Sequence, residues 1–345
     1  MTRTNWGSFG VAWAMVRDEE SSRQDRNQAI WQYTAGNPNR LPMRTPLQMK
    51  QQIKKAFHHF GYEVHRIESS RQEAFQEKGG PRIKEPPFLD PIWPLPRCSG
   101  GRSNDQIREE FTKYDLWHYA YEFEGGLSFS ARHNDPDPVV DAPERPLQRF
   151  RHFMPYLVAA NGGCLRGKRI LDIACNSGFW SIQCALLGAE VVGFDGRAEL
   201  IRQADLIKSI VGADNVQFRV LDFWDMSRQA LGETFDIVLN LGILYHLHDP
   251  LRALQLTKLM ARQYILLDTA VYPSKESVIK LRWEDPTDIR NATGSGIVAS
   301  PSKSGIELML RHIGVARWFE IPIRSSDMPR DYLDCWRSSW LIEVA

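Results

Sequence analysis

Two patterns of hydrophobic and polar positions divide this chain near residue 145. After that point, short apolar runs of strand length alternate with segments in which apolar residues recur every three or four positions, the period of a helix. This alternation predicts an α/β fold, a doubly wound and mostly parallel seven-stranded sheet with a reversed or antiparallel edge. The predicted strands are 169–173, 191–194, 216–221, 235–239, 264–269, 319–323 and 339–344, and the predicted helices are 179–187, 200–210, 250–260 and 304–312.

The residues before position 145 have a less regular pattern. Residues 47–60 carry apolar side chains at helical spacing, and a short extended piece follows Gly61. Five prolines between Lys84 and Arg97 exclude a regular helix or a central strand, so we expect an extended strap over the surface of a domain. We therefore predict an N-terminal cap or substrate lid at 1–145, partly helical and with the proline-rich strap, and a second domain at 146–345.

The charge of the chain is almost balanced, with 43 Lys and Arg residues against 42 Asp and Glu residues. A chain without a broad positive field does not gather nucleic acid non-specifically, although a local basic patch is compatible with it. The five cysteines include no CxxC pair, which argues against a disulfide framework or a zinc site, and we expect no metal. No apolar run reaches the ~18–20 residues of a membrane span, so we expect a soluble, cytoplasmic protein without a membrane partner.

A turn of small residues follows the first predicted strand of the second region, and a helix follows the turn. This arrangement forms the ligand crevice at the carboxyl edge of an open α/β sheet. Small residues let the backbone approach a ligand, and the N-terminus of the helix offers free N–H groups to a carboxylate. A tight turn in any α/β protein is the alternative. The candidate cofactor-binding residues here are Asp172, Ala174, Cys175, Asn176, Gly178 and Phe179.

Polar and aromatic residues also stand at the ends of the next three strands. Asp195 ends the second strand, 23 residues after Asp172, where an acid accepts hydrogen bonds from both hydroxyls of a ribose. Asp222 ends the third strand beside two aromatic residues, a combination suited to the amino group and ring of adenine. Because the carboxyl ends of parallel strands meet at one edge of a sheet, we expect one site. Its further candidates are Asp195, Gly196, Arg197, Asp222, Phe223, Trp224, Leu241, Gly242 and Tyr245.

In the order of these motifs and in the closing strands, residues 165–345 resemble the class I S-adenosylmethionine-dependent methyltransferases. The resemblance implies a Rossmann-like domain, S-adenosyl-L-methionine as cofactor and S-adenosyl-L-homocysteine as product. It also implies that the turn 172–178 is the first cofactor motif, that Asp195 binds the ribose and that Asp222 and Phe223 bind the adenine. Residues 241–250 resemble one branch in particular, which includes bacterial enzymes acting on the wobble uridine of tRNA and many small-molecule methyltransferases.

Methyl transfer is an in-line displacement, so the enzyme has to align the acceptor and remove its proton. His246, just after the fourth strand, is the candidate general base; a histidine bonded to a carbonyl or stacked on Tyr245 is the alternative.

The aromatic block at 114–121 predicts a substrate pocket, with packing in a core as the alternative, favoured for Trp117. Arg149 and Arg151 suit an anionic substrate or the cofactor carboxylate, and are otherwise surface charges. Arg290 lies in a polar excursion after the fifth strand, residues 272–301, and long insertions there often carry substrate contacts. The candidate substrate residues are Tyr114, Trp117, His118, Tyr121, Arg149, Arg151 and Arg290.

The activity that these features predict is O-methylation of a small molecule, a sugar or a natural product, which suits the near-neutral charge and the aromatic residues of the cap. The enzymatic alternative is modification of tRNA at the wobble uridine, which predicts a contiguous basic surface and salt-sensitive binding. A second alternative is an inactive methyltransferase-like partner subunit, because Ala174 and Asn176 replace glycines common in the first turn. The sequence leaves the acceptor and a homodimeric state open.

Overall fold

The structure, a computed structural model, describes residues 13–17, 62–66, 86–98, 102–133, 137, 142–291, 294, 296–315 and 317–344. The chain forms two compact units, 1–76 and 77–345. In the first unit, strands β1 (Trp13–Arg17) and β2 (Tyr62–Arg66) pair in antiparallel fashion. The extended piece predicted after Gly61 is strand β2, and the helix predicted at 47–60 lies outside the described residues.

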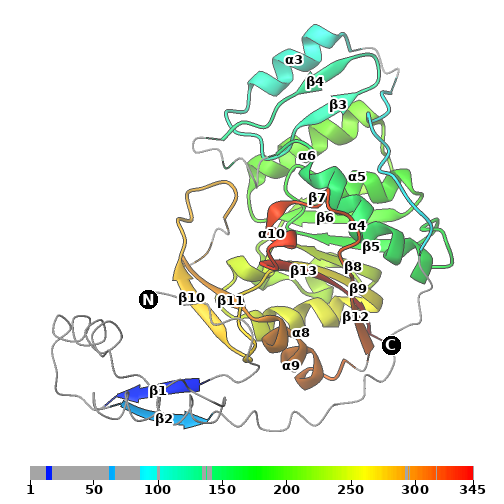
Figure 1. The fold of residues 1–345 in the computed structure, drawn as a ribbon. Coiled ribbons are helices and arrows are strands. Elements are labelled where there is room, and N and C mark those ends of the chain that lie inside the picture. The colour runs from blue at the N-terminus through cyan, green and yellow to red at the C-terminus, as the bar shows by residue number, and fades with distance from the viewer. Residues whose placement is uncertain are drawn as a thin grey trace, which may run out of the picture. The chain divides into compact units, whose positions relative to one another are not determined.

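A sheet of seven strands forms the centre of the second unit (Figure 1). The strands are β5 (Arg169–Ile173), β6 (Glu190–Asp195), β7 (Val216–Val220), β8 (Phe235–Leu241), β9 (Ala261–Ala270), β12 (Arg317–Glu320) and β13 (Arg337–Glu343). They lie in the order β12-β13-β9-β8-β5-β6-β7, and β13 runs antiparallel to both of its neighbours. The remaining pairs are parallel, which confirms the predicted doubly wound, mostly parallel sheet with a reversed strand near one edge.

Helices cover both faces of this sheet. They are α4 (Arg145–Ala160), α5 (Phe179–Leu186), α6 (Ala198–Val211), α8 (Pro250–Met260) and α9 (Lys303–His312), with the short turns η1 (Phe223–Asp225), α7 (Arg228–Leu231), η2 (Leu244–His246) and α10 (Arg330–Leu333). Successive residues of a strand point to opposite sides. In β8, Ile237 belongs to the core that contains α4, α5 and α6, and Val238 to the core that contains α8 and α9. In the described part of the chain, no helix combines the length and the apolar character needed to span a membrane.

Residues 86–133 pack against the face of the sheet that carries α4, α5 and α6. They contain helix α3 (Asn104–Thr112) and the hairpin of β3 (Tyr121–Phe123) and β4 (Leu127–Phe129), seen above α6 in Figure 1. Phe111 of α3 and Phe150 of α4 belong to one buried core. These residues therefore fold as part of the same unit as the sheet, and the cap role predicted for residues 1–145 stays a prediction.

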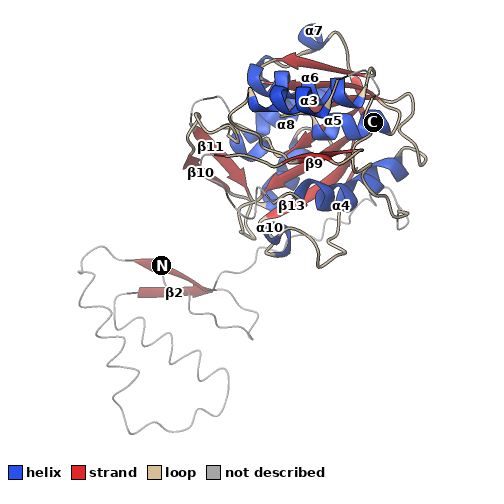
Figure 2. Ribbon diagram, turned by 90° about the horizontal axis from the view of Figure 1, so that it is seen from above, coloured by secondary structure: helices blue, strands red, loops and turns tan. Residues whose placement is uncertain are grey.

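The polar excursion after β9 contains a second hairpin. Its strands β10 (Ile279–Trp283) and β11 (Ile297–Pro301) are antiparallel, and Figures 1 and 2 both show them beside the main sheet. The N–H of Tyr272 donates to the Pro301 carbonyl at 2.8 Å, and the N–H of Ala299 donates to the Leu247 carbonyl at 2.9 Å. The second bond fastens β11 to the chain just after η2, so the hairpin is held against the loop that follows β8.

Candidate active site

A cavity of about 480 Å³ opens where the carboxyl ends of β5, β6, β7 and β8 meet. Because β5 lies between β6 and β8, the strand order reverses there, and open α/β sheets bind their ligands at such points. The volume suits a small-molecule site, for which ~300–1,000 Å³ is usual. Predicted residues from all four strand ends line the cavity. They are Ala174, Asn176, Asp195, Gly196, Arg197, Asp222, Phe223, Trp224, Leu241, Gly242, Tyr245 and His246, with His118, Arg149 and Arg290 from the substrate candidates.

Three residues with positive φ fold the turn after β5: Ala174 at 54°, Asn176 at 52° and Gly178 at 86°. Glycine is required at the last of these positions, because a Cβ atom there would lie 2.7 Å from the Cζ atom of Phe218. Gly178 is also the N-cap residue of α5. The N–H of Asn176 donates a hydrogen bond of 3.1 Å to Asp195, which joins the first strand end to the second.

Four of the predicted ligands in this turn do not line the cavity. Asp172 is buried and accepts a hydrogen bond of 2.6 Å from the Ser181 hydroxyl, and burial raises the pKa of Asp172 to about 7. Cys175 and Phe179 are also buried, and Gly178 lies against Phe218 of β7 and Ala204 of α6. These four residues shape and support the turn from behind the cavity, and the cofactor-binding role predicted for them stays a prediction.

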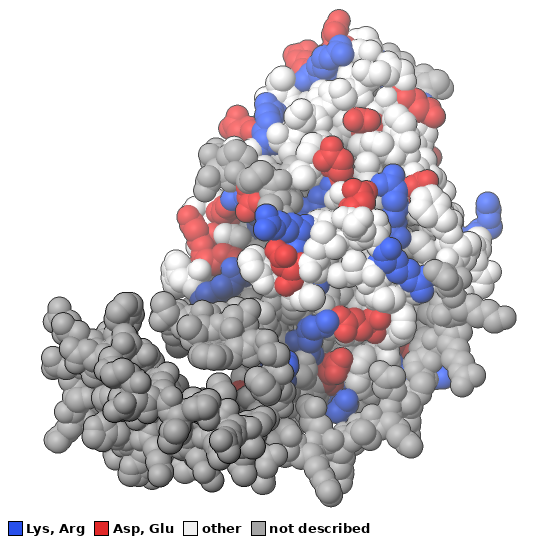
Figure 3. Space-filling view, in the orientation of Figure 1, with Lys and Arg blue, Asp and Glu red and all other residues white. Residues whose placement is uncertain are grey.

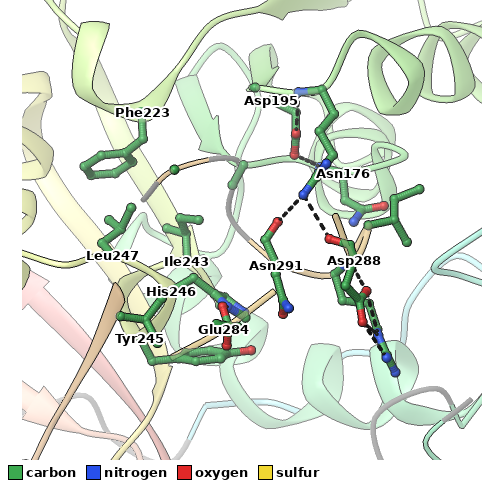
Figure 4. Close-up of a pocket in the computed structure, with 18 of the residues that line it drawn as sticks. Asn176, Asp195, Phe223, Ile243, Tyr245, His246, Leu247, Glu284, Asp288 and Asn291 are labelled. Carbon is green, nitrogen blue, oxygen red and sulfur yellow. Dashed lines mark hydrogen bonds and ion pairs between the residues drawn. The ribbon is translucent and has the colours of Figure 1, made fainter. Parts of the chain in front are cut away.

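Asp195 ends β6 with its carboxylate at the cavity (Figure 4). One carboxylate oxygen accepts the N–H of Asn176 at 3.1 Å, and the other accepts the N–H of Arg197 at 3.0 Å. Burial raises the pKa of Asp195, and these two backbone hydrogen bonds oppose the rise. A carboxylate has about four acceptor positions, so this side chain keeps acceptor capacity for the hydroxyl groups of a ligand.

Arg197 lines the cavity and also ties down the loop that follows β10. Its guanidinium donates to the carbonyl oxygens of Pro286 at 2.9 Å, Asp288 at 2.9 Å and Asn291 at 2.8 Å. Figure 4 shows Asn291 and Asp288 beside Asp195 as a result. The sequence predicted a cofactor contact for Arg197 and gave no signal of this second task, since the bonded carbonyls lie about ninety positions away.

The third strand end contributes an acid and two aromatic side chains. Asp222 caps η1 by accepting the N–H of Trp224 at 2.8 Å. Phe223 is mostly buried, and the Trp224 ring lies 4.7 Å from the His248 ring and 5.1 Å from the Arg252 guanidinium, measured to ring centroids. The third strand end thus adds a carboxylate and two aromatic side chains to the lining of the cavity.

His246 on η2 faces a carboxylate that sequence reasoning missed. Its Nδ1 atom contacts Oε2 of Glu284, the residue that follows β10, and its ring centroid lies 4.0 Å from that of Tyr245. Burial lowers the pKa of His246, but the Tyr245 side chain and the Glu284 carboxylate together raise it above the ordinary value. The Tyr245 ring foreseen as a stacking partner lies against the imidazole but is tilted from it by 39°, and this contact occurs together with the carboxylate contact.

Tyr245 is bonded to a second residue without a sequence signal, Arg337 at the start of β13. The Nη2 atom of Arg337 donates to the Tyr245 hydroxyl at 3.1 Å. Burial raises the pKa of this tyrosine, but the positive charges of His246 and Arg337 outweigh burial and lower the pKa to about 7. The end of the cavity near η2 therefore holds two neighbouring side chains, an imidazole and a phenol, each of which shifts the pKa of the other.

A buried network of charged side chains supports this end of the cavity. Asp268, at the carboxyl end of β9, accepts hydrogen bonds of 2.7 Å from both Arg149 and Arg337 and is fully buried. Burial opposes ionisation of Asp268, but the two guanidinium groups hold its pKa well below the usual range. Arg149 was predicted to meet an anionic substrate; it does line the cavity, with its charge matched by Asp268.

Several substrate candidates lie outside the cavity. Trp117 stacks on Phe111 with ring centroids 4.3 Å apart, and the hydroxyl of Tyr121 donates to the Ser177 carbonyl at 2.8 Å. Both are fully buried, as the alternative of packing in a core predicted. The half-buried Tyr114 packs against the same core. Of the candidates in this block His118 lines the cavity, together with Tyr119, which was not a candidate, and burial lowers the pKa of His118 to about 3.

Of the two remaining substrate candidates, Arg151 and Arg290, one lies outside the cavity and the other lines it. Arg151 lies on the surface of α4, where its Nε atom donates to Asp90 at 2.6 Å, and it does not line the cavity. Arg290 does line the cavity and pairs with Asp288 at 2.7 Å. The prediction of a substrate contact is thus compatible with the placement of Arg290 and not with that of Arg151.

Comparison with known proteins agrees with this geometry. Residues 165–291 match the model of a family described as a methyltransferase domain. The fold is shared with the N-terminal domain of EvdMO1, crystallised with S-adenosylhomocysteine and D-fucose, at a TM-score of 0.55 and 22% identity over 72% of this chain and 98% of that one. Residues 165–291 thus match a methyltransferase domain, and the resemblance to the class I S-adenosylmethionine-dependent superfamily that the motifs predicted is confirmed.

Two curated relatives are more similar in sequence. A tRNA U34 carboxymethyltransferase of Alteromonas mediterranea is 30% identical over 193 residues, 53% of this chain and 54% of the relative. A ubiquinone biosynthesis O-methyltransferase of Xanthomonas campestris pv. campestris is 35% identical over 112 residues, 32% of this chain and 46% of the relative. The chain spans about half the length of the curated relatives that it matches.

Proposed function

We propose that this protein transfers a methyl group from S-adenosyl-L-methionine to a hydroxyl group of a small molecule, a sugar or a natural product. The observation that carries the proposal is the convergence of four strand ends on one cavity, with Asp195 and Asp222 on one wall and His246 on the other. Such convergence of acceptors and a titratable group at the switch point of the sheet is what a cofactor-dependent transfer requires.

The residues present fit the cofactor. Asp195 has acceptor positions for the ribose hydroxyls, and Asp222 with Phe223 suits the adenine. Gly242, at φ of 112°, has open space where a Cβ atom would stand and lines the cavity, so the backbone there is accessible to a ligand. When bound, S-adenosylmethionine supplies a methyl group activated by a positively charged sulfur.

The proton of the acceptor goes to His246 in this proposal. As the acceptor oxygen forms its bond to the methyl carbon, the bond from that carbon to sulfur breaks and its electron pair stays on sulfur. The acceptor O–H proton moves to the imidazole, which acts as general base. Burial of His246 and its contact with Glu284 fix the ring beside the cavity, so alignment and proton removal occur at one place.

The small-molecule acceptor is supported by the size of the cavity and by the charge of the surface. The face in Figure 3 shows Lys and Arg intermixed with Asp and Glu among the residues described. The second candidate is modification of tRNA at the wobble uridine, which the 30% identity to a tRNA U34 carboxymethyltransferase favours. That candidate predicts binding that weakens steeply with salt, by roughly 10³–10⁵ from 50 to 200 mM for six to ten phosphate contacts.

Calorimetric titration of the purified protein with S-adenosylmethionine and S-adenosylhomocysteine tests the proposal. Micromolar binding of both supports it, and sugars, natural products and tRNA are then screened as acceptors with the released S-adenosylhomocysteine as readout. Failure of both to bind overturns the proposal and favours an inactive partner subunit. Methylation or carboxymethylation of tRNA alone, with salt-sensitive binding, replaces the small-molecule candidate by the tRNA candidate.

A further inference from the structure

Glu284 lines the cavity and contacts His246, and no sequence motif indicated it. It follows β10, and its N–H donates to the Gly296 carbonyl at 2.7 Å, which closes the hairpin at that point. Its Oε2 atom contacts Nδ1 of His246, and its Oε1 atom lies 3.3 Å from the guanidinium of Arg282. The side chains of Glu284 and His246 are each only 9% exposed, so water screens this contact weakly.

We propose that Glu284 is the positioning residue for His246: it fixes the imidazole with the proton on Nδ1, so that Nε2 is the atom that takes the proton of the acceptor. This inference rests on the proposed methyl transfer. A carboxylate on one ring nitrogen of a histidine selects the tautomer, holds the ring plane and stabilises the imidazolium that forms. Glu284 does this from a hairpin distant in sequence, 38 positions after His246.

Other charged and titratable side chains lie near His246, and their positions show which of them act directly on the imidazole. Tyr245 on η2 lies against the ring, and Arg337 of β13 and Arg149 of α4 lie beyond the tyrosine. Strand β11 packs against η2 with Ile297–Pro301, which contain no titratable side chain. On β9, Asp268 is matched by the two arginines. On α8, Arg252 lies over Trp224 and Lys258 donates to the Ile313 carbonyl. Glu284 is therefore the carboxylate that acts directly on the imidazole.

The loop after Glu284 is fixed at its far end as well. Arg197 donates to the carbonyl oxygens of Pro286, Asp288 and Asn291, so the loop is fastened to the N-terminus of α6. Glu284 is fastened to His246 on η2. The loop 284–291 thus contacts both the part of the cavity at Asp195 and the part at His246. Figure 4 shows Glu284 beside His246, and Asp288 and Asn291 between them and Asp195. This double attachment limits the positions that the Glu284 carboxylate can adopt.

The test is an NMR titration of the histidines in the full chain, with and without S-adenosylhomocysteine. The resonances of His246 are assigned with His246→Gln. In wild type we expect the Nδ1–H tautomer and a midpoint above that of an ordinary histidine. In Glu284→Gln, which keeps the shape and removes the charge, we expect a lower midpoint and loss of the single tautomer. Glu276→Gln, an exposed change in the same excursion, should match wild type.

Glu284→Asp keeps the charge and separates an electrostatic role from a folding defect: its midpoint should stay above that of Glu284→Gln. With an acceptor, Glu284→Gln should lower kcat ~10-fold or more, shift the acid limb of the rate profile to lower pH and leave KM for S-adenosylmethionine within ~2-fold. An unchanged or raised midpoint and an unchanged tautomer in Glu284→Gln overturn the inference. Because the titration needs neither cofactor nor acceptor, failure of S-adenosylhomocysteine to bind counts only against the proposed function.

Discussion

The two walls of the cavity are built in different ways. On the wall formed by the strand ends, Asn176, Asp195 and Asp222 are held by hydrogen bonds to backbone N–H groups close in sequence or on the next strand. On the opposite wall, Glu284 and Arg337 are held by other charged or aromatic side chains from distant elements. The first wall uses fixed dipoles of the backbone, and the second uses charges that are paired with one another.

This difference suits different tasks. Backbone N–H groups hold a carboxylate in one place without a competing proton, which suits recognition of ribose and adenine. Paired side chains titrate, and their pKa values depend on one another, which suits a group that has to accept and release a proton. The pKa of Tyr245 at about 7, and the raised pKa of His246 beside it, fall on the second wall.

Removal of the imidazole should have the largest effect. We expect His246→Ala to lower kcat by ~100-fold or more, because general base catalysis of this kind contributes 10²–10⁴. Binding of S-adenosylmethionine should change little, since the strand-end wall is intact. Turnover with the screened acceptor and calorimetry measure the two quantities. His312→Ala, an exposed histidine on α9, is the matched control. A wild-type rate in His246→Ala would remove this residue as the base.

The charge pairs of the second wall predict a large loss of stability. Asp268→Ala leaves Arg149 and Arg337 buried without their shared carboxylate, and breaking a buried pair in this way costs about 3–5 kcal/mol. Urea unfolding monitored by circular dichroism measures the loss. Asp334→Ala removes a carboxylate from an exposed pair with Arg330 and should cost less than about 1 kcal/mol. If both variants lose equally little free energy of unfolding, Asp268 does not stabilise the fold by neutralising the two buried arginines.

The first wall could be predicted from sequence. On the second wall, His246, Tyr245 and Arg149 were candidates, but their partners Glu284, Arg337 and Asp268 could not be predicted. Asp195 and Asp222 each stand directly after a strand that the apolar pattern marks, so strand order alone brings them together. Arg337 begins the antiparallel strand β13 and binds Asp268, which lies 69 positions away in the sequence. Arg149 lies in helix α4 and binds the same carboxylate from 119 positions away. No local pattern encodes such pairs.

Two further errors have equally local causes. The alternation of Ile279, Leu281 and Trp283 with charged residues is a signal for β10, but all five residues of the strand are exposed, so it reads as a polar excursion. Tyr121 was placed near the substrate, and Trp117 was named there although packing in a core was favoured for it, because aromatic residues suit both pockets and cores. Composition does not distinguish the two, whereas burial against Phe111 and Ser177 does.

Asp195→Ala tests the strand-end wall by itself. We expect affinity for S-adenosylmethionine to fall at least ~10-fold, the effect of losing ~1.4 kcal/mol of hydrogen bonding to the ribose, with the fold intact. Because burial raises the pKa of Asp195, wild-type affinity should weaken as the pH falls through that raised pKa, and the variant should lack this dependence. Calorimetry across pH measures both. Asp205→Ala on the exposed side of α6 is the control; unchanged affinity in Asp195→Ala would refute the ribose assignment.

The smallest expected effect concerns the link between the walls. Arg197→Lys keeps the charge at the start of α6, but its shorter side chain does not place an ammonium where the Nη2 atom of Arg197 donates to the three carbonyl oxygens of the loop 284–291. Amide hydrogen exchange in that loop should rise a few-fold, while exchange in β6 stays unchanged, because Asp195 is held by backbone N–H groups instead. Arg202→Lys, exposed on the same helix, should leave both segments as in wild type.

If amide exchange rises equally in the loop and in β6, the two walls form one cooperative unit, and the division between a backbone-held and a charge-held wall fails. If only the loop responds, the second wall can loosen while the first stays in place, and proton transfer is then the step sensitive to the loop.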